Sequence, residues 1–195
     1  AIDRGAKYVT KVQVTMDLIF NNATHVRFSN IDPESEEAFR TTPKGERKMR
    51  NIWSGWSQVN GNPKKWRLSK GDGEKTVWIQ FRNKRNQISS VVRDTIILDT
   101  THPTGSIFIN RGADTVPPGQ PVILQCNAQD VTTGVGQMRI ANAPFQDKET
   151  GWTDYTSTKT GWTLEPGEGI RSVFVQYRDR AGNVSKVYRD SIKVE

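Results

Sequence analysis

Residues that commonly carry catalysis are scarce and scattered in this chain of 195 residues, which has two histidines and one cysteine. His25 and His102 lie far apart, and neither has a cysteine or carboxylate at the spacing of a metal site. Gly71–Glu74 and Gly167–Gly169 lack the Lys-Ser/Thr pair and the following helix of a phosphate loop, so we expect turns there. The sequence therefore predicts no catalytic residue, no metal and no cofactor, and we do not expect an enzyme.

Four carboxylates need a separate explanation, because they fall near the middle and the end of the chain: Asp94, Asp99, Asp190 and Glu195. Oxygen ligands at a join between domains can bind calcium and stiffen a tandem array. Asp94 and Asp190, however, each follow an arginine and precede apolar strand residues. This setting favours a hydrogen bond or an ion pair within the fold.

The single cysteine, Cys126, alternates with apolar residues in the stretch Val122–Ala128. We match it with Met16, in a similar apolar stretch near the start of the chain. An exchange of Met for Cys on an inward face indicates apolar filling of a core. Cys126 is therefore predicted to be buried and unreactive, and the fold has no disulfide.

Tryptophans could stack on sugars or bases, but four of the six recur at equivalent positions of a repeat described below: Trp56, Trp152, Trp66 and Trp162. Packing in a core is the expected role of these four. Trp53 borders an insertion, and Trp78 faces away from Val77 and Ile79 on its strand.

Trp53 and Trp78 have several cations near them in the sequence, and together these residues form our candidate ligand-binding face: Trp53, Lys64, Lys65, Trp78, Arg82, Lys84 and Arg85. An outward tryptophan buried against a neighbouring subunit is the alternative interpretation. The net charge of +7 supports a basic face, since residues 1–99 carry 18 Lys+Arg against 11 Asp+Glu, whereas residues 100–195 carry 10 of each. Such a patch fits a polyanion or is simply a solvated surface that keeps the protein in solution.

An internal repeat organises the chain: residues 66–99 align without a gap on residues 162–195, and about 12 of these 34 pairs are identical. Each copy holds two alternating, strand-like runs joined by a tight turn. Where the second copy has Gly182 in this turn, the first has Asn86, the residue that next best tolerates a left-handed backbone. The repeat predicts one β module used twice.

Seven or so short strands in each repeat, with no long helix, predict two tandem immunoglobulin-like or fibronectin-III-like β-sandwiches. We assign repeat 1 to residues 1–99, a short semi-rigid linker to 100–107 and repeat 2 to 108–195. Repeat 1 carries an insertion near 31–54, in which the segment from Asp32 is predicted to form a short helix behind Pro33. The chain begins and ends within the repeat pattern, so we expect a piece of a longer or processed polypeptide.

Four motifs recur in order and resemble the Ig-like repeats of large bacterial extracellular and cell-surface proteins: residues 94–106, 109–113, 136–140 and 173–185. The resemblance covers both repeats nearly end to end. It implies sandwiches without disulfides that act as spacers, stalks, adhesion modules or accessory domains. Residues 83–87, in place of an Asp-x-Ala-Gly-Asn turn, and the insertion depart from the pattern, which argues against a single shared ligand site.

We therefore expect a non-enzymatic structural or assembly module, a spacer, stalk or subunit of a filament or surface layer, outside the cell or on its surface. Its expected partners are other Ig-like repeats, copies of itself or other cell-surface proteins. The alternative function is binding of an acidic polysaccharide or other polyanion through the basic face of repeat 1. Neither function involves nucleic acid, and no apolar run is long enough to span a membrane.

Overall fold

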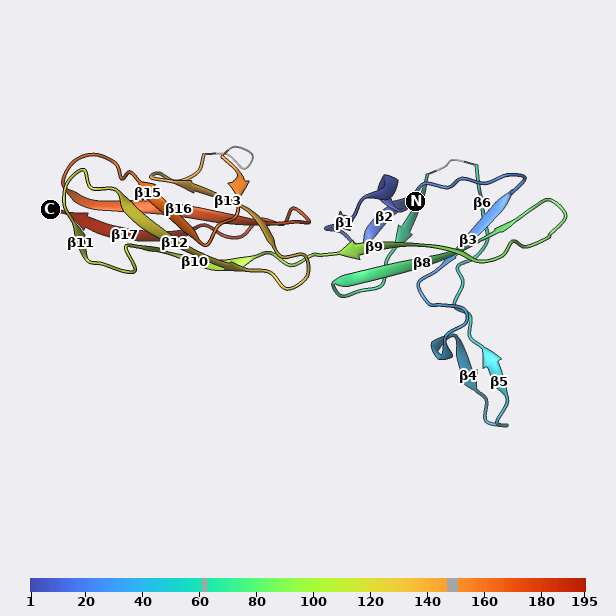
Figure 1. The fold of residues 1–195 in the computed structure, drawn as a ribbon. Helices are drawn as coiled ribbons and strands as arrows, with labels where there is room; N and C mark the ends of the chain where they lie inside the picture. Colours follow the sequence, from blue (N-terminus) through green and yellow to red (C-terminus); the bar gives the residue numbers. More distant parts are fainter. Residues whose placement is uncertain (61–62, 147–150) are drawn as a thin grey trace. The chain divides into compact units, whose positions relative to one another are not determined.

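The computed structural model describes residues 1–60, 63–146 and 151–195 (Figure 1). The chain divides into two compact units, Ala1–Asp99 and Thr100–Glu195. Each unit is built from short strands in two layers, with its own apolar core between them. The single cysteine of the sequence excludes a disulfide within the chain.

In the second unit the two sheets face each other with three and five strands. The first sheet has the order β10 (Thr104–Ile109), β12 (Val122–Gln129) and β15 (Thr158–Trp162). The second has the order β11 (Thr115–Val116), β17 (Tyr188–Val194), β16 (Gly169–Asp179), β13 (Val135–Ala141) and β14 (Thr153–Asp154). Since β11 runs parallel to β17 while the other pairs are antiparallel, this is an immunoglobulin-like sandwich.

The first unit repeats this arrangement, with one strand fewer in the smaller layer among the described residues. Its larger sheet has the order β1 (Tyr8–Val9), β9 (Val92–Leu98), β8 (Gly73–Arg82), β3 (His25–Ser29) and β6 (Ser57–Gln58). The opposite layer is the pair β2 (Gln13–Met16) and β7 (Lys64–Arg67). Again the short first strand, β1, is parallel to the last strand, β9. All-β architecture as two Ig-like sandwiches without disulfides is thus confirmed.

Alternation along each strand produces these layers. On β8, Val77 and Ile79 are buried, whereas Trp78 and Gln80, which alternate with them, point away from the core and are only half-buried. The first core is completed from the opposite layer by Val14 and residues near it. The outer faces of the two layers therefore point in opposite directions.

A left-handed turn lets the first strand of each unit cross from one layer to the other. Residues 3–5, the 3-10 turn η1 (Asp3–Gly5), have φ of 41°, 58° and 81°, and residues 110–112 have 46°, 61° and 85°. Three consecutive residues with positive φ are costly without glycine, and glycine holds the last position both times. The predicted bend at Gly5 and Gly112 is present.

The closing hairpin confirms the expected exchange of Asn86 for Gly182, whose φ angles are 63° and 103°. The match of Met16 with Cys126 is wrong by two residues. Pairing places Val14 opposite Trp66 and Val122 opposite Trp162, so Met16 corresponds to Leu124. Leu18 is thus the counterpart of Cys126. The shift does not change which side of the strand faces inward, and Cys126 is fully buried as predicted.

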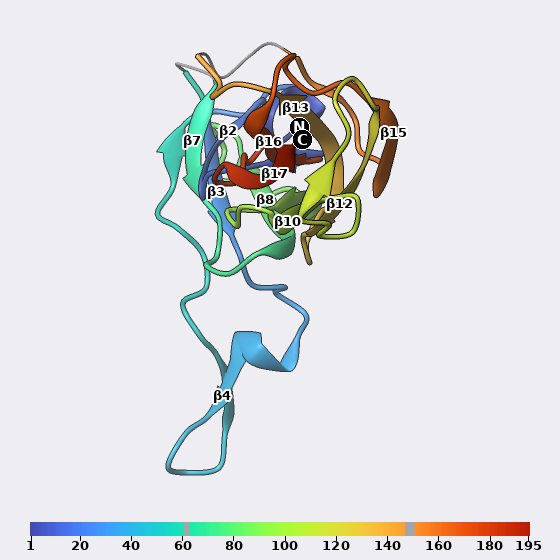
Figure 2. The same cartoon turned by 90° about the vertical axis from the view of Figure 1, so that its left-hand side faces the viewer.

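Two segments differ from expectation. Where a short helix was expected, the insertion holds a 3-10 turn of 3 residues, η2 (Glu36–Ala38). A hairpin of β4 (Phe39–Thr41) and β5 (Arg47–Met49) follows it. Figures 1 and 2 show this hairpin standing away from the sheets of its unit. The expected linker of residues 100–107 is strand from Thr104 onward, because β10 pairs with β12 there. None of the helices in the described part of the chain has the length and apolar character needed to cross a membrane.

Candidate functional site

The most concentrated set of aromatic and basic side chains is a stack on the outer face of the larger sheet of the first unit. The guanidinium carbon of Arg27 lies 4.7 Å from the ring centre of Trp53 and 4.6 Å from that of Trp56. Arg82 covers Trp56 from the other side at 4.8 Å. Aromatic rings and cations therefore alternate along the stack, and each contact is electrostatically favourable. The order is Trp53, Arg27, Trp56, Arg82.

Hydrogen bonds fix the arginine at the centre of this stack. Arg27 donates from Nε and Nη2 to Oε1 of Gln80, at 3.2 and 2.7 Å. Gln80 in turn donates to the carbonyl oxygen of Ser89 at 3.2 Å. The side chain of Arg27 is therefore oriented by the sheet itself, with no ligand needed.

The second unit contains the same stack with one replacement. Arg139 lies 4.2 Å from the ring of Phe145 and 5.0 Å from that of Trp152, and Arg178 covers Trp152 at 4.4 Å. Gln176 accepts two hydrogen bonds from Arg139, at 3.0 and 2.6 Å. Phe145 thus stands where the first unit has Trp53.

The two stacks differ at one hydrogen bond. In the second unit Gln137 lies opposite Arg178 across the strands and accepts from its Nε at 2.9 Å. In the first unit His25 lies opposite Arg82, and the ring Nδ1 of His25 is 3.0 Å from Oγ1 of Thr24. The buried Nε of Arg82 has no partner among the residues that the structure describes.

Burial also affects the charge of the first stack. Desolvation lowers the pKa of the Arg27 guanidinium below its usual value, and the positive charge of Arg82 lowers it further. Arg27 and Arg82 both contact the indole ring of Trp56. These two cation–π contacts offset the repulsion between the guanidinium groups.

Sequence reasoning missed Arg27 and Arg139, which hold the centres of the stacks. Both occur in the matched segments 26–30 and 138–142. An arginine at the same place in both segments, with an apolar residue on each side of it, was the signal for them. The expectation that Trp56 and Trp152 pack in the core is wrong, because both lie in these outer stacks and outside the two core clusters.

Trp66 and Trp162 do pack against the two cores, as predicted. Each indole Nε1 donates at 2.7 Å to an asparagine side chain, Asn30 in the first unit and Asn142 in the second. These asparagines precede the divergent region of the repeats, and they anchor it to the neighbouring strand.

The seven residues predicted as a single ligand-binding face lie in separate places. Trp53 and Arg82 belong to the stack. Trp78 borders a hollow of about 210 Å³ between residues 32–34 of the insertion and residues 91–93. Lys65 is exposed on β7, in the opposite layer, and Lys64 beside it donates to the carbonyl oxygen of Asn60 at 2.6 Å.

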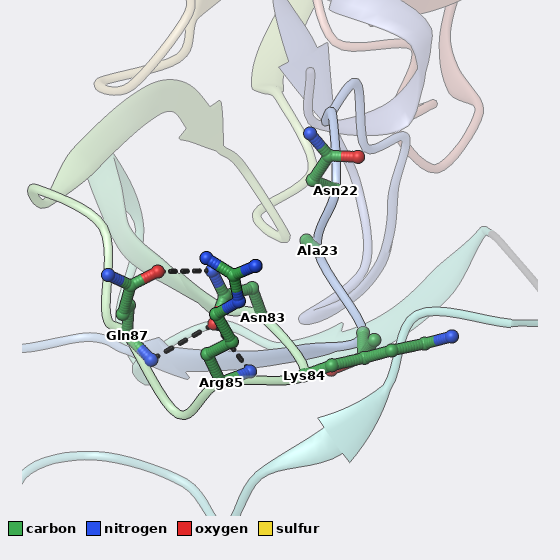
Figure 3. A pocket seen from close by; sticks show the side chains of 7 residues that line it. Asn22, Ala23, Asn83, Lys84, Arg85 and Gln87 are labelled. Atoms are coloured by element: carbon green, nitrogen blue, oxygen red, sulfur yellow. Dashed lines mark hydrogen bonds between the residues drawn. The ribbon is translucent and has the colours of Figure 1, made fainter.

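Lys84 and Arg85 border another hollow, of about 520 Å³, at the turn of the closing hairpin (Figure 3). Asn83 builds the turn, because its Oδ1 accepts from the backbone N–H groups of Arg85 and Gln87 at 2.9 and 3.1 Å. Figure 3 shows Arg85 folded over Asn83, while Lys84 extends in another direction. This hollow is open and positively charged.

The corresponding place in the second unit is acidic. Asp130 and Asp179 stand where the first unit has Asn22 and Asn83, and two of their carboxylate oxygens lie within 4.8 Å of each other. Both carboxylates accept hydrogen bonds from the backbone of the loops that follow them. Oδ1 of Asp130 accepts from three backbone N–H groups of residues 132–134, and Asp179 accepts from Gly182 and Asn183. Two neutral asparagines of the first unit are therefore replaced by carboxylates in the second.

The carboxylates considered for calcium include two with structural hydrogen bonds, the role that we favoured for them. Asp94 and Asp190 each accept from the backbone N–H just before the left-handed turn of their unit, that of Ile2 or of Ile109, at 2.7 Å in both cases. Asp99 is fully buried at the end of the first unit, and Glu195 pairs with Lys193 at the end of the chain.

The Cys126 thiol is buried in the core of the second unit. Burial is the main factor that raises the pKa of the Cys126 thiol to about 11, so the thiolate is disfavoured at neutral pH. His102 is exposed, and His25 lies on the strand beside the first stack.

The sequence matches no protein-family model and no curated protein. Among solved structures, one similar structure is that of the fibronectin(III)-like modules of CbhA from Clostridium thermocellum, with 9% identity and a TM-score of 0.44 over 100% of this chain and 93% of that one. Another is murine CEACAM1b, with 14% identity and a TM-score of 0.43 over 97% of this chain and 95% of that one. The strand order and the parallel first strand described above define each unit as an Ig-like sandwich.

Proposed function

We propose that this chain is a non-catalytic structural or assembly module that works outside the cell or on its surface. The observation that carries this proposal is the duplicated stack. Arg27 and Arg139, the groups best suited to grip a ligand, are each enclosed by two aromatic rings and a glutamine of their own unit. Side chains used in this way stiffen a sheet and leave little for chemistry.

The connection between the units supports a role as a spacer or stalk. Strand β9 ends at Leu98 and β10 begins at Thr104, so only residues 99–103 separate the last strand of one unit from the first of the next. This connection contains Pro103, which is buried, and no glycine. A short segment of this composition behaves as a semi-rigid join.

Small-angle scattering and sedimentation of the full chain test the proposal. A spacer gives an elongated particle whose maximum dimension hardly changes with salt. Inserting a flexible Gly-Ser segment between Thr101 and His102 should broaden the distribution of distances, while a conservative substitution at exposed Thr101 should not. A compact particle that the insertion leaves unchanged would contradict a spacer function.

Binding of a polyanion such as an acidic polysaccharide remains a second candidate, favoured by the open hollow that Lys84 and Arg85 border. Residues 1–99 hold the whole net charge of +7, so the field of the first unit attracts anions to this hollow.

Retention of the full chain on heparin measures this candidate function. The double variant Lys84→Glu and Arg85→Glu should elute at markedly lower salt, because two cations become two anions at the hollow. The matched control reverses Lys65 and Arg67, exposed on β7 in the opposite layer. Equal losses in the two double variants would show that only net charge matters, and would argue against a site.

A further inference from the structure

The insertion of the first unit carries its charges in two separate blocks. Residues 32–37, which we call the base, hold four carboxylates and no cation. Residues 39–50, which form the hairpin of β4 and β5 and which we call the arm, hold five cations and one carboxylate. The base thus has a charge of −4 and the arm a charge of +4, so the insertion is neutral as a whole but dipolar.

Two ion pairs within the insertion leave charges of both signs over. Arg47 of the arm pairs with Glu36 of the base at 2.9 Å, and Lys48 pairs with Glu46 at 3.0 Å. Across the described residues, no ion pair holds the other six charged side chains of the insertion. These are Asp32, Glu34 and Glu37 on the base, and Arg40, Lys44 and Arg50 on the arm. Three carboxylates and three cations therefore remain for an outside partner.

The pairing of the hairpin keeps the tip of the arm away from its own base. Three consecutive residue pairs of β4 and β5 carry the chain outward to a turn at residues 42–45. A backbone hydrogen bond from Thr42 to Glu46, at 2.8 Å, closes this turn. Lys44 therefore lies at the tip, and Figures 1 and 2 show the hairpin standing away from the sheets of its unit.

Contacts at both ends of the insertion hold it against the larger sheet and the neighbouring layer. At the entry, Asn30 accepts from the indole N–H of Trp66 at 2.7 Å. At the exit, Trp53 stacks on Arg27 at 4.7 Å, and the N–H of Ser54 donates to a carbonyl oxygen of β3 at 2.8 Å. The first stack therefore anchors the root of the arm.

Beyond this root the arm has no neighbouring strand. In the part of the chain that the structure describes, β4 and β5 form a sheet of two strands only. Met49 is 52% exposed, and Pro43 in the turn is exposed as well. Because an isolated two-stranded hairpin is only marginally stable in water, a partner that packs against the arm would stabilise it.

A hollow of about 210 Å³ lies beside the base. Its apolar lining residues are Trp78, Val91 and Val92. The two valines are 39% and 46% exposed, so apolar surface is open to a partner here. Among the charged lining residues, Asp32 and Glu34 outnumber the single cation, Arg93. The hollow thus suits an apolar group that lies next to a cation.

The turn of the arm has this composition. Pro43 and Lys44 are adjacent in it, and both are exposed. The proline ring offers apolar surface to Trp78, and the ammonium group of Lys44 is attracted by the carboxylates of the base. Since the hairpin stands away from its own base, the turn fits the hollow of another copy.

We propose that two copies of this chain associate through their insertions, with the turn of each arm placed on the base and the hollow of the other. Because each copy supplies both an arm and a base, the contact occurs twice about a two-fold axis and closes as a dimer. Arg40 and Lys44 of one copy then face Glu34 and Glu37 of the other. This inference deepens the proposed assembly function and rests on it.

Other partners match only half of the insertion. A polyanion, or an acidic surface of another protein, attracts the three cations of the arm but is repelled by the three carboxylates of the base. A second copy satisfies both sets of charges at once. The segregation of charge therefore favours self-association.

Sedimentation equilibrium of the full chain tests the dimer. The contact is small, so we expect a weak monomer–dimer equilibrium at protein concentrations of about 0.01–1 mM. Salt screens exposed charges, and the dissociation constant should rise about tenfold or more between about 0.05 and 0.5 M salt. A chain that stays monomeric at low salt over this range of concentration would overturn the proposal.

Charge reversal identifies the residues in contact. The arm variant carries Arg40→Glu and Lys44→Glu, and the base variant carries Glu34→Lys and Glu37→Lys. Each variant alone should lose the dimer, because like charges meet at both contacts. An equimolar mixture of the two should associate again, because both contacts then join opposite charges. A mixture that stays monomeric would overturn the pairing of arm with base.

Net charge does not explain such a rescue. Each double reversal shifts the net charge of +7 by four, so the arm variant carries +3 and the base variant +11, and both stay positive. The matched control, Lys65→Glu with Arg67→Glu on the exposed side of β7, also carries +3 and should dimerise as the parent does. Loss of the dimer in this control would show that the arm is not the contact.

A chain with all four reversals gives a second test that does not depend on mixing. It should dimerise with itself, since arm and base are complementary again, but not with the parent. Loss of heparin retention in the arm variant, combined with a parent that stays monomeric, would instead assign the arm to a polyanion. At dilutions below the range of the dimer, the scattering experiment above tests the spacer function alone. A chain that is elongated but never dimerises would keep that function and lose only this inference.

Discussion

Asp94 accepts a hydrogen bond from the backbone N–H of Ile2 at 2.7 Å, although 92 positions separate them in sequence. Asp190 makes the same bond to Ile109 at the same length. In both units this bond ties the residue that lies just before the left-handed turn to the last strand, β9 or β17.

Removing this acceptor should therefore destabilise the first unit. Asp94→Ala leaves the N–H of Ile2, whose side chain is 1% exposed, without its partner, and we expect the free energy of unfolding to fall by about 1–3 kcal/mol. Asp94→Asn keeps an oxygen acceptor and should lose less than half as much. Urea unfolding of the full chain measures both variants. An alanine variant as stable as the parent would show that water replaces the carboxylate.

The unsatisfied Nε of Arg82 offers a change in the opposite direction. His25→Gln copies the residue that serves Arg178 in the second unit, where Gln137 accepts from Nε at 2.9 Å. The new hydrogen bond to a charged donor should raise the free energy of unfolding by about 1 kcal/mol. Thermal unfolding detects this as a higher transition temperature.

The control for this substitution is His25→Leu, which provides similar bulk without an acceptor. If the leucine variant gains as much stability as the glutamine variant, loss of the imidazole, and not the new hydrogen bond, is the cause.

The centre of the stack should matter more than its end. Trp56 lies between two guanidinium groups, at 4.6 and 4.8 Å, whereas Trp53 contacts Arg27 alone at 4.7 Å. Trp56→Leu removes both contacts and leaves Arg27 and Arg82 to repel each other, so we expect a loss of about 2–4 kcal/mol. Trp53→Leu should lose about 1 kcal/mol. Equal losses measured by urea unfolding would contradict the stacking order.

Sequence pattern was sufficient for the features that repeat with little change. Three pairs of equivalent residues are examples, and their roles follow from period-two burial and turn chemistry. The pairs are Trp66 and Trp162, Asn86 and Gly182, and Asp94 and Asp190. The role of Trp56 could not be predicted in this way. From the sequence alone, such a tryptophan is predicted to lie in a core or in a ligand site. Only the structure shows the arginine of the neighbouring strand beside it.

The candidate binding face was beyond sequence reasoning for a different reason. Lys65 and Arg82 are only 17 positions apart, but they belong to opposite layers, since β7 pairs with β2 and β8 with β3. Nearness in sequence does not place two residues on one face when the chain crosses between layers.

The thiol of Cys126 provides a test of the second core through pH. Burial raises its pKa from 9.0 to about 11, so the unfolded chain loses this proton at lower pH than the folded chain. Proton loss from the unfolded state favours unfolding, and the stability that the buried neutral thiol contributes is present below pH 9 and is lost as pH rises toward 11. Tyr177 beside it acts in the same direction, since burial also raises its pKa. Urea unfolding of the second unit should become easier from pH 9 to 11, and Cys126→Ala should show a smaller decline over this interval. A decline as steep in the alanine variant would show that the Cys126 thiol is not its cause.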